Sequence, residues 1–369
     1  MLNQLEEKIA TEIYEKGPMR FKRFMHLALY DPEHGFYTNH VKIGQSIAEN
    51  DFITHPEEYS PKYGGSFATL IEKLSSELPK TDLDIVEMGA GNGILARDLL
   101  DHLKNTFPDI YERVTYRIVE ISPYLMRKQA DSLVGHDNVV ISKGVAQNPS
   151  LDPFDGFIIT NELPDAFPVD IVANINGQGL SVVSIDVENE SFVTVLEPTK
   201  DPDILEYLEL GGYTDRLTLL HAHSGINEAR KYGVPINKDM LKWYDSSLKL
   251  IKSGAIITTD YGYTSGKEHA KSLNNIRTYS REYHNHSYKG KTGLFFNVGK
   301  VDLTSDINFA LLMQKGYENG FSDVFFGRES KITKAYSKLK PRLNFTTLIQ
   351  GKNMPPLYLG PKIFKFFQK

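Results

Sequence analysis

The chain contains no cysteine, which excludes disulfide bonds, thiolate zinc sites and cysteine nucleophiles. No apolar run approaches the roughly 18 residues that a membrane-spanning helix needs, so we expect no membrane insertion. The formal net charge is only -5, which argues against broad electrostatic binding to nucleic acid. The acidic, amphipathic opening segment resembles neither a secretory signal nor an Arg-rich transit peptide. These absences predict a globular protein of a reducing compartment, most simply the cytoplasm.

The 369 residues have an ordinary composition, with 40% hydrophobic and 24% charged side chains, which excludes a disordered or fibrous chain. Residues 1–80 are expected to form an N-terminal helical cap. Leu5, Ile9 and Ile13 recur at helical spacing, and Gly17 followed by proline ends that run. Residues 35–60 contain glycine, histidine and aromatic residues without a period, which predicts a long loop of the kind that often carries function.

From residue 81 to 369 the pattern alternates short strands with helices, which is typical of a parallel sheet covered on both faces. Between about 171 and 236 this alternation stops, and three strand-like segments separated by turn residues predict an antiparallel β insertion. Asn237 is expected to cap a helix that carries Met240 to Ile251, with Gly254 just past its end. The expected strands are 83–88, 116–121, 139–142, 157–160 and 255–260, with closing strands at 321–326 and 363–367.

The sharpest motif is the glycine-rich turn Gly89-Ala-Gly91-Asn-Gly93, which follows a buried strand ending at Glu87-Met88 and opens a helix. Glycines there permit positive φ and a close main-chain approach to a ligand. The next strand ends in Glu120, whose carboxylate can accept hydrogen bonds from both hydroxyls of a ribose. This combination predicts a nucleoside-containing cofactor, although a purely structural turn and a solvated strand end are the plain alternatives.

Two cofactors fit the turn. The dinucleotide fingerprint requires Gly or Ala at its sixth position, which is met by Ala96 only when counting starts at Gly91. The acidic-x-Gly-x-Gly-x-Gly form that starts at Glu87 matches the first motif of S-adenosylmethionine (SAM) methyltransferases without such a shift. The motif therefore favours SAM, and NAD stays open as the alternative.

A second motif, ITNELPDAFPVD, follows the fourth strand, at the edge where open α/β sheets bind ligands. It brings one amide, Asn161, and two carboxylates, Glu162 and Asp165, to that edge; helix capping is the alternative role for Asn161 and Asp165. Two carboxylates suit a cationic acceptor such as a guanidinium. The histidine pairs at 221/223 and 284/286 lack a carboxylate pattern, so we predict no metal site. The basic run from Lys331 to Arg342 is expected to be a solvated helix face.

Taken in order, several segments resemble the MidA-type SAM-dependent methyltransferases, whose mitochondrial members support respiratory complex I assembly. The segments are RFMHLALYDPEHGFY, DFITHPE, the glycine turn, IVEISP, NELPDAFPV, TDYGY and VDLTSDINF. The resemblance covers most of the chain. It implies a seven-stranded, Rossmann-like class I methyltransferase core, an N-terminal helical segment over the cofactor, and protein arginine methylation as the activity.

The resemblance also implies roles for individual residues. Gly89, Gly91 and Gly93 would lie against SAM, and Glu120 would bind its ribose. Asn161, Glu162 and Asp165 would lie on the acceptor side and carry catalysis. The remaining cofactor residues would be Glu87, at the start of the motif, and the loop residues Phe52, Thr54, Pro56 and Glu57.

We therefore predict a SAM-dependent methyltransferase that acts on a nitrogen of a protein arginine, with a respiratory-complex subunit as one candidate partner. A non-catalytic SAM-binding assembly factor is the second hypothesis, and an NAD-dependent enzyme is the third. The sequence leaves the acceptor protein, the degree of methylation and the oligomeric state open.

Overall fold

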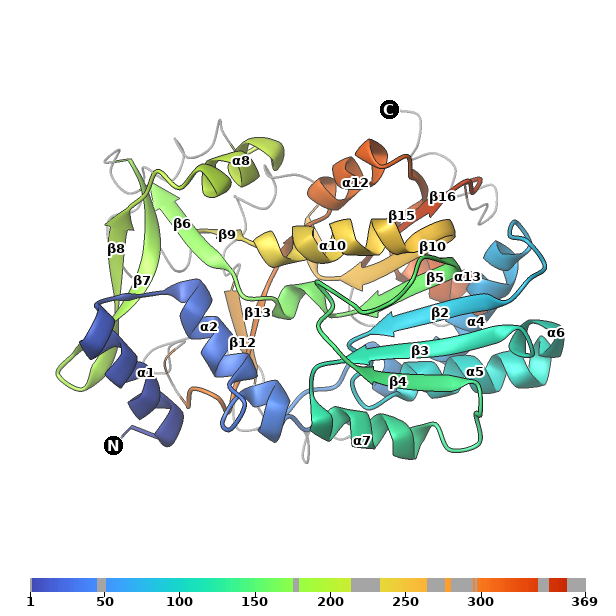
Figure 1. The fold of residues 1–369 in the computed structure, drawn as a ribbon, viewed down its shortest axis with the longest axis horizontal. Helices are drawn as coiled ribbons and strands as arrows, with labels where there is room; N and C mark the ends of the chain where they lie inside the picture. The colour runs from blue at the N-terminus through green and yellow to red at the C-terminus, as the bar shows by residue number, and fades with distance from the viewer. Residues whose placement is uncertain are drawn as a thin grey trace.

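The computed structural model describes residues 2–44, 51–174, 179–213, 233–263, 276–279, 295, 297–337 and 345–356. Two β-sheets organise these residues: a seven-stranded sheet on the right of Figure 1 and a smaller antiparallel sheet on the left. Helices cover both faces of the larger sheet. The expected α/β class, with its seven-stranded sheet, is confirmed.

The large sheet is parallel over five of its strands. Its order is β15 (Ser322–Arg328), β16 (Thr346–Lys352), β10 (Ile251–Asp260), β5 (Phe154–Asn161), β2 (Leu83–Met88), β3 (Val114–Glu120) and β4 (Val139–Lys143). β16 runs antiparallel to both of its neighbours, whereas β10, β5, β2, β3 and β4 are parallel. Parallel pairing puts the carboxyl ends of these five strands at one edge, where open α/β sheets bind ligands.

Successive side chains of each central strand enter opposite cores. Ile85 packs in the hydrophobic cluster that includes α4 (Lys62–Ser75), α5 (Ile94–Thr106) and α13 (Ser330–Ser337). Its neighbour Val86 packs in the cluster on the opposite face, with α10 (Lys238–Leu250) and α12 (Phe309–Glu318). This two-fold alternation is the geometry of a strand, and burial on both faces explains the continuous apolar runs of β2 and β5. The remaining helices of this half are α6 (Pro108–Tyr111) and α7 (Pro123–Ser132).

The small sheet has the order β1 (Met19–Arg20), β7 (Leu180–Glu188), β6 (Asp170–Asn174) and β9 (Val234–Ile236), with β8 (Ser191–Pro198) also paired to β7. All of its pairings are antiparallel, as expected for the insertion. α1 (Gln4–Lys16) and α2 (Phe21–Tyr30) share a core with this sheet, through side chains such as Ile9, Phe24 and Ile185. The division of the chain at residue 80 stays a prediction.

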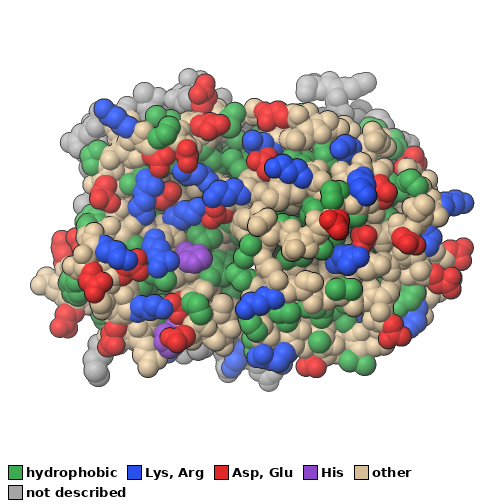
Figure 2. Space-filling view, viewed as in Figure 1, with side chains coloured by type: hydrophobic (Ala, Val, Ile, Leu, Met, Phe, Trp, Pro, Cys, Tyr) green, Lys and Arg blue, Asp and Glu red, His purple; other side chains and the backbone are tan. Residues whose placement is uncertain are grey.

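Several short elements connect these parts: η1 (Phe36–His40), α3 (His55–Glu58), η2 (Pro164–Ala166), α8 (Pro202–Leu210), β11 (Gly262–Tyr263), β12 (Ile276–Tyr279), β13 (Asp302–Ser305) and β14 (Ile307–Asn308). Ion pairs also join the N-terminal segment to the rest of the chain. Lys22 of α2 lies 2.9 Å from Asp239 of α10, and Arg20 lies 3.3 Å from Asp201. Basic and acidic side chains are interspersed on the face shown in Figure 2.

Two sequence expectations need correction. Gly254 does not end the helix that Asn237 caps; it lies inside β10, which begins at Ile251 directly after α10. The second closing strand is Thr346–Lys352, which we did not predict, and residues 363–367 lie outside the described part of the chain. β16 was missed because its mixed threonine and glutamine sequence is buried by its neighbours in the sheet.

Gly254 and Gly156 stand side by side in adjacent strands at φ +135° and +149°. A Cβ on Gly156 would lie 1.9 Å from the carbonyl oxygen of Asp84, and one on Gly254 would lie 1.8 Å from that of Gly156. Main chain fills both positions, so the central strands β2, β5 and β10 can pair in this register only with glycine there.

Gly156→Ala is therefore expected to lower the free energy of unfolding by at least about 3 kcal/mol, or to prevent folding, because the Asp84 main chain cannot yield. Gly135→Ala is the matched control: Gly135 also has a positive φ, +97°, but a Cβ there meets nothing within 4 Å. The control should cost only about 1–2 kcal/mol of backbone strain. Urea denaturation of both variants measures the difference, and equal losses would contradict this account of the sheet.

Candidate cofactor and acceptor site

The glycine turn lies between β2 and α5, at the carboxyl edge of the large sheet. Gly89, Gly91 and Gly93 have φ of +74°, +53° and +80°. A Cβ at these positions would lie 2.8 Å from Leu163 Cδ1, 3.3 Å from Ile43 Cδ1 and 3.2 Å from Gln129 Cα, respectively. The turn therefore needs glycine for its backbone conformation and because atoms of neighbouring residues leave little room for a side chain.

Glu120 ends β3 beside the turn and is buried, with 4% of its surface exposed. One carboxylate oxygen accepts a hydrogen bond from the Ser122 amide and the other from Gln129 Nε2, both at 2.9 Å. The same Gln129 amide group also donates to the carbonyl oxygen of Gly91 at 2.9 Å. Burial raises the pKa of Glu120, and these donors oppose the rise.

Gln129 was missed by the sequence reasoning, although it ties the acid of β3 to the glycine turn. The available signal was its place on α7, four residues after Leu125 on the same buried face. A glutamine at an otherwise apolar helix position needs a polar partner. Here it has two.

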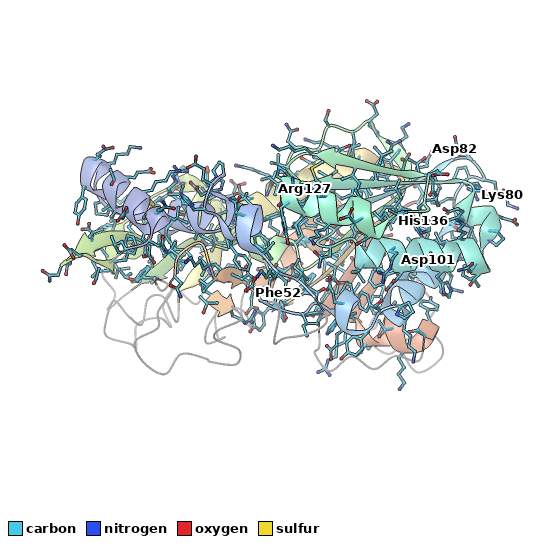
Figure 3. The ribbon with its side chains drawn as sticks, turned by 90° about the horizontal axis from the view of Figure 1, so that it is seen from below. Phe52, Lys80, Asp82, Asp101, Arg127 and His136 are labelled. Carbon is cyan, nitrogen blue, oxygen red and sulfur yellow. The ribbon has the colours of Figure 1, made fainter. Side chains whose placement is uncertain are left out.

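Of the loop residues predicted to cover the cofactor, Phe52 is connected to the turn. Phe52 forms a bridge with Ile43, whose carbonyl oxygen accepts from Asn92 Nδ2 of the turn at 2.6 Å. Figure 3 shows Phe52 where the two halves of the molecule meet. Thr54 precedes α3, and Pro56 and Glu57 are buried within it.

Glu57 and Glu87 are buried carboxyls that influence one another. Burial, opposed by hydrogen bonds, raises the pKa of each to about 7, and the charge of Glu57 contributes to the rise at Glu87. Glu87 accepts a hydrogen bond from the Tyr116 hydroxyl at 2.8 Å. Both side chains are therefore able to hold a proton near neutral pH.

The residues predicted for the acceptor side lie together at the end of β5. Asn161 Nδ2 donates to Glu162 Oε1 at 3.0 Å, and the Asp165 amide donates to Asp260 Oδ2 of β10 at 3.1 Å. Glu162 adopts φ +53°, a left-handed conformation that is uncommon outside glycine and concentrates at functional sites. Leu163, directly after Glu162, is the side chain that packs on Gly89.

The buried carboxyl groups of Glu162 and Asp165 are more stable when they are protonated or paired with a cation. Burial raises the pKa of Glu162 well above its ordinary value, and the charge of Asp165 adds to the rise. Burial, followed by the charge of Asp302, raises the pKa of Asp165 to about 8. A cation placed here would therefore be held strongly.

Two further side chains reach this cluster from distant parts of the chain. The Tyr63 hydroxyl of α4 lies 2.8 Å from Asn161 Oδ1 and also contacts a carboxylate oxygen of Glu329. The other oxygen of Glu329 lies 2.8 Å from His55 Nδ1. Glu329, 266 residues after Tyr63, directly precedes α13 and carried no sequence signal.

Comparison with known proteins identifies the family. Residues 66–325 match the family described as "Putative S-adenosyl-L-methionine-dependent methyltransferase". The chain belongs to this family. It is thus a SAM-dependent methyltransferase, as expected from the MidA-type resemblance, and the NAD alternative falls.

The chain is similar to a Burkholderia thailandensis protein crystallised with S-adenosyl-homocysteine. The TM-score is 0.76, at 20% identity, over 96% of this chain and 93% of that one, a likeness that shows the fold. It is also 26% identical over 335 residues to "Protein arginine methyltransferase NDUFAF7 homolog, mitochondrial" of Drosophila melanogaster, covering 84% of this chain and 69% of that protein. The Xenopus tropicalis relative of the same name is 32% identical over 137 residues, 36% of this chain and 30% of its own length.

The names of these relatives overturn one expectation. They are called mitochondrial, so the prediction of a cytoplasmic protein is wrong. Among the described residues, no helix is long and apolar enough to cross a membrane, and no group of three or more histidine, aspartate or glutamate side chains could hold a metal ion. The histidine pairs at 221/223 and 284/286 lie outside the described residues.

The residues around the turn fit SAM. Each oxygen of Glu120 accepts one hydrogen bond from Ser122 or Gln129, which leaves lone pairs for the hydroxyls of a ribose. Gln129 Oε1 is buried beside the turn without a hydrogen-bond partner among the described residues. A bound ligand with hydroxyl or amino donors would satisfy these acceptors.

The raised pKa of Glu87 predicts a pH dependence of stability. Because the folded state raises this pKa from 4.5 to about 7, the folded protein retains a proton that the unfolded chain has lost. That stabilisation is complete below about pH 4.5 and is lost as the pH rises through about 7. Glu87→Gln stays neutral at every pH. The unfolding free energy of this variant, relative to that of the wild type, should therefore rise by about 2–3 kcal/mol from acidic to mildly alkaline pH.

Urea denaturation of the cofactor-free protein at a series of pH values measures this gain. Glu188→Gln, at an exposed position of β7, is the control and should follow the wild-type curve. A constant difference between Glu87→Gln and wild type across the pH range would show that folding does not raise the pKa of Glu87.

Proposed function

We propose that this protein transfers a methyl group from SAM to a guanidinium nitrogen of an arginine in a protein. One observation carries the proposal: two acids, Glu162 and Asp165, flank the residue that packs on the cofactor turn, since Leu163 Cδ1 lies 2.8 Å from the Cβ position of Gly89. A cationic acceptor bound by these acids would lie beside the methyl donor. The names of the curated relatives, which are protein arginine methyltransferases, support the same acceptor.

On the cofactor side, the main chain at Gly89, Gly91 and Gly93 lies against SAM, and Glu120 accepts from its ribose hydroxyls. Gln129 fixes the orientation of the Glu120 carboxylate. Glu87 and the cover residues Phe52, Thr54, Pro56 and Glu57 complete the cofactor surface.

On the acceptor side, Glu162 and Asp165 hold the guanidinium by paired hydrogen bonds, while Asn161 orients Glu162. Bound SAM supplies a methyl group made electrophilic by a positive sulfonium. As the N–C bond forms and the S–C bond breaks, one guanidinium N–H proton passes to the Glu162 carboxylate. Arginine is such a weak acid that this proton leaves only as the bond forms. The products are methylarginine, S-adenosyl-homocysteine and a proton, which Glu162 releases to water.

We propose a protein partner of mitochondrial origin, and respiratory-complex subunits are the first set to test because the relatives are named as mitochondrial. Mass spectrometry of such proteins, from cells with and without this protein, would reveal a methylarginine that depends on it.

The cofactor assignment predicts the behaviour of Glu120→Gln. The amide that replaces the carboxylate can no longer accept hydrogen bonds at both oxygens, so SAM should bind about 10- to 100-fold more weakly. Calorimetric titration with SAM measures this loss. Glu209→Gln, an exposed acid of α8, is the control and should bind like the wild type. Unchanged binding by Glu120→Gln would remove Glu120 from the site.

The acceptor assignment predicts a different result for Glu162→Gln. The rate of methyl transfer to an arginine peptide should fall about 10²- to 10³-fold, because the proton acceptor and one negative charge are lost. SAM affinity should stay within about threefold of wild type, since Glu162 contacts the acceptor and not the cofactor. Radiolabelled methyl transfer and SAM titration separate the two effects. Undiminished transfer would place the chemistry elsewhere, and a wild-type protein that methylates lysine peptides alone would refute the arginine acceptor.

A further inference from the structure

A buried chain of hydrogen bonds connects two acids that lie far apart in the sequence. Glu329 contacts the Tyr63 hydroxyl, Tyr63 lies 2.8 Å from Asn161 Oδ1, and Asn161 Nδ2 lies 3.0 Å from Glu162 Oε1. Tyr63 and Glu329 are completely buried, with no exposed surface. Water therefore cannot supply or remove a proton within the inner part of this chain.

The number of protons available to the chain is limited. Tyr63 has a single hydroxyl proton, yet its oxygen has an acceptor on either side, Glu329 and Asn161 Oδ1. Burial and the charge of Glu329 raise the pKa of Tyr63 well above 10, so the hydroxyl stays protonated. If Glu329 is ionised and Asn161 keeps its oxygen toward Tyr63, two oxygens face each other with no proton between them.

When the two acids carry one proton between them, two arrangements satisfy every contact. In the first, a protonated Glu329 donates to Tyr63, Tyr63 donates to Asn161 Oδ1, and the Asn161 amide donates to an ionised Glu162. In the second, the Asn161 amide is turned over: a protonated Glu162 donates to Asn161, Asn161 donates to Tyr63, and Tyr63 donates to an ionised Glu329. Each arrangement places one proton on one of the two acids.

We propose that Glu162 and Glu329 share one proton through Tyr63 and Asn161, so that the buried Glu329 sets the protonation state of the acceptor-side acid. Glu329 and Tyr63 are then positioning residues, because they act on the reaction through Glu162. The catalytic consequence rests on the proposed function: Glu162 can receive the proton of the acceptor only while Glu329 holds the shared one.

His55 favours the second arrangement. In both arrangements an oxygen of Glu329 accepts from His55 Nδ1 at 2.8 Å, and this hydrogen bond is stronger when Glu329 is ionised. His55 Nε2 is buried without a partner among the described residues, which favours the neutral ring with its proton on Nδ1. The ring therefore donates to Glu329 without bringing a charge into the core.

Other charged groups near the two acids bear on any titration. Glu162 also faces Asp165 and Glu57, whose charges raise its pKa, and Asp260 lies in the same cluster. These groups act through space. The contribution of Tyr63 is distinct because it requires hydrogen bonds, and removing one hydroxyl changes no formal charge.

The test is a titration of the neutral Glu162 carboxyl by infrared spectroscopy on the intact chain, without an acceptor. The Glu162 signal is the C=O band that disappears in Glu162→Gln. Glu329→Gln keeps a permanent donor toward Tyr63, so the Asn161 amide stays turned toward Glu162. It should lower the pKa of Glu162 by more than about one unit.

The deciding measurement repeats this comparison in a Tyr63→Phe background. If the coupling runs through the hydroxyl, Glu329→Gln should shift the pKa of Glu162 by less than half as much there. An equal shift in both backgrounds would mean that Glu329 acts only through its charge, and would overturn the proposal. Tyr244→Phe, which removes another buried hydroxyl, between α10 and β16, is the matched control and should leave the full shift in place.

If Glu329→Gln does not fold, Tyr63→Phe alone decides. A changed titration of Glu162 at unchanged SAM affinity supports the shared proton, and an unchanged titration overturns it. Because the infrared titration needs no methyl acceptor, its outcome is independent of the arginine assay. If the titration shows the shared proton but arginine is not methylated, only the proposed acceptor is refuted. If arginine is methylated but the titration shows no coupling, only the shared proton is refuted.

Discussion

The parallel pairing of β2, β3, β5 and β10 is the constraint on which the site depends. Main-chain hydrogen bonds fix these strands in one register, and their carboxyl ends then bring the glycine turn, Glu120, Asn161 and Asp260 to a single edge. Gly156 and Gly254 permit this register, because the neighbouring main chain occupies the space of a Cβ at both positions. The residues of the candidate site occupy an edge that the backbone and the two hydrophobic cores position.

The edge concentrates carboxyl groups away from water, which a fold tolerates only when the charges are neutralised or paired. Different members of the group achieve this in different ways. Glu120 is satisfied by donors from α7 and its cap, Glu87 by a tyrosine and a raised pKa, and Asp165 by a pKa raised to about 8, a rise that the charge of Arg277 opposes. The proposed arginine acceptor supplies a further cation. Under the proposed function, binding of the cofactor and of a cationic acceptor offsets part of the cost of burying these acids.

The sequence predicted the cofactor side of the site more completely than its surroundings. The turn at Gly89–Gly93 and the acid at Glu120 are local patterns. Each lies at the end of a strand and can be recognised from a few consecutive residues. Gln129, Tyr63 and Glu329 could not be found in that way, because their partners are distant in the chain and their meeting depends on how α7, α4 and the segment before α13 pack. The strand Thr346–Lys352 was missed for a related reason. Its sequence shows no alternation of polar and apolar residues, and its polar residues are buried only because neighbouring strands pair with it.

The sequence by itself determined the fold class, the cofactor and the acids at the end of β5, where we propose that the acceptor binds. Hydrophobic periodicity, glycines at turns and acids at strand ends are local features of the sequence, each visible within a few consecutive residues. Only the tertiary structure decided that the first two helices share a core with the inserted sheet, and that Glu329 contacts Tyr63 and through it Asn161. These contacts join segments far apart in the chain, and the burial that makes them strong exists only after the chain has folded.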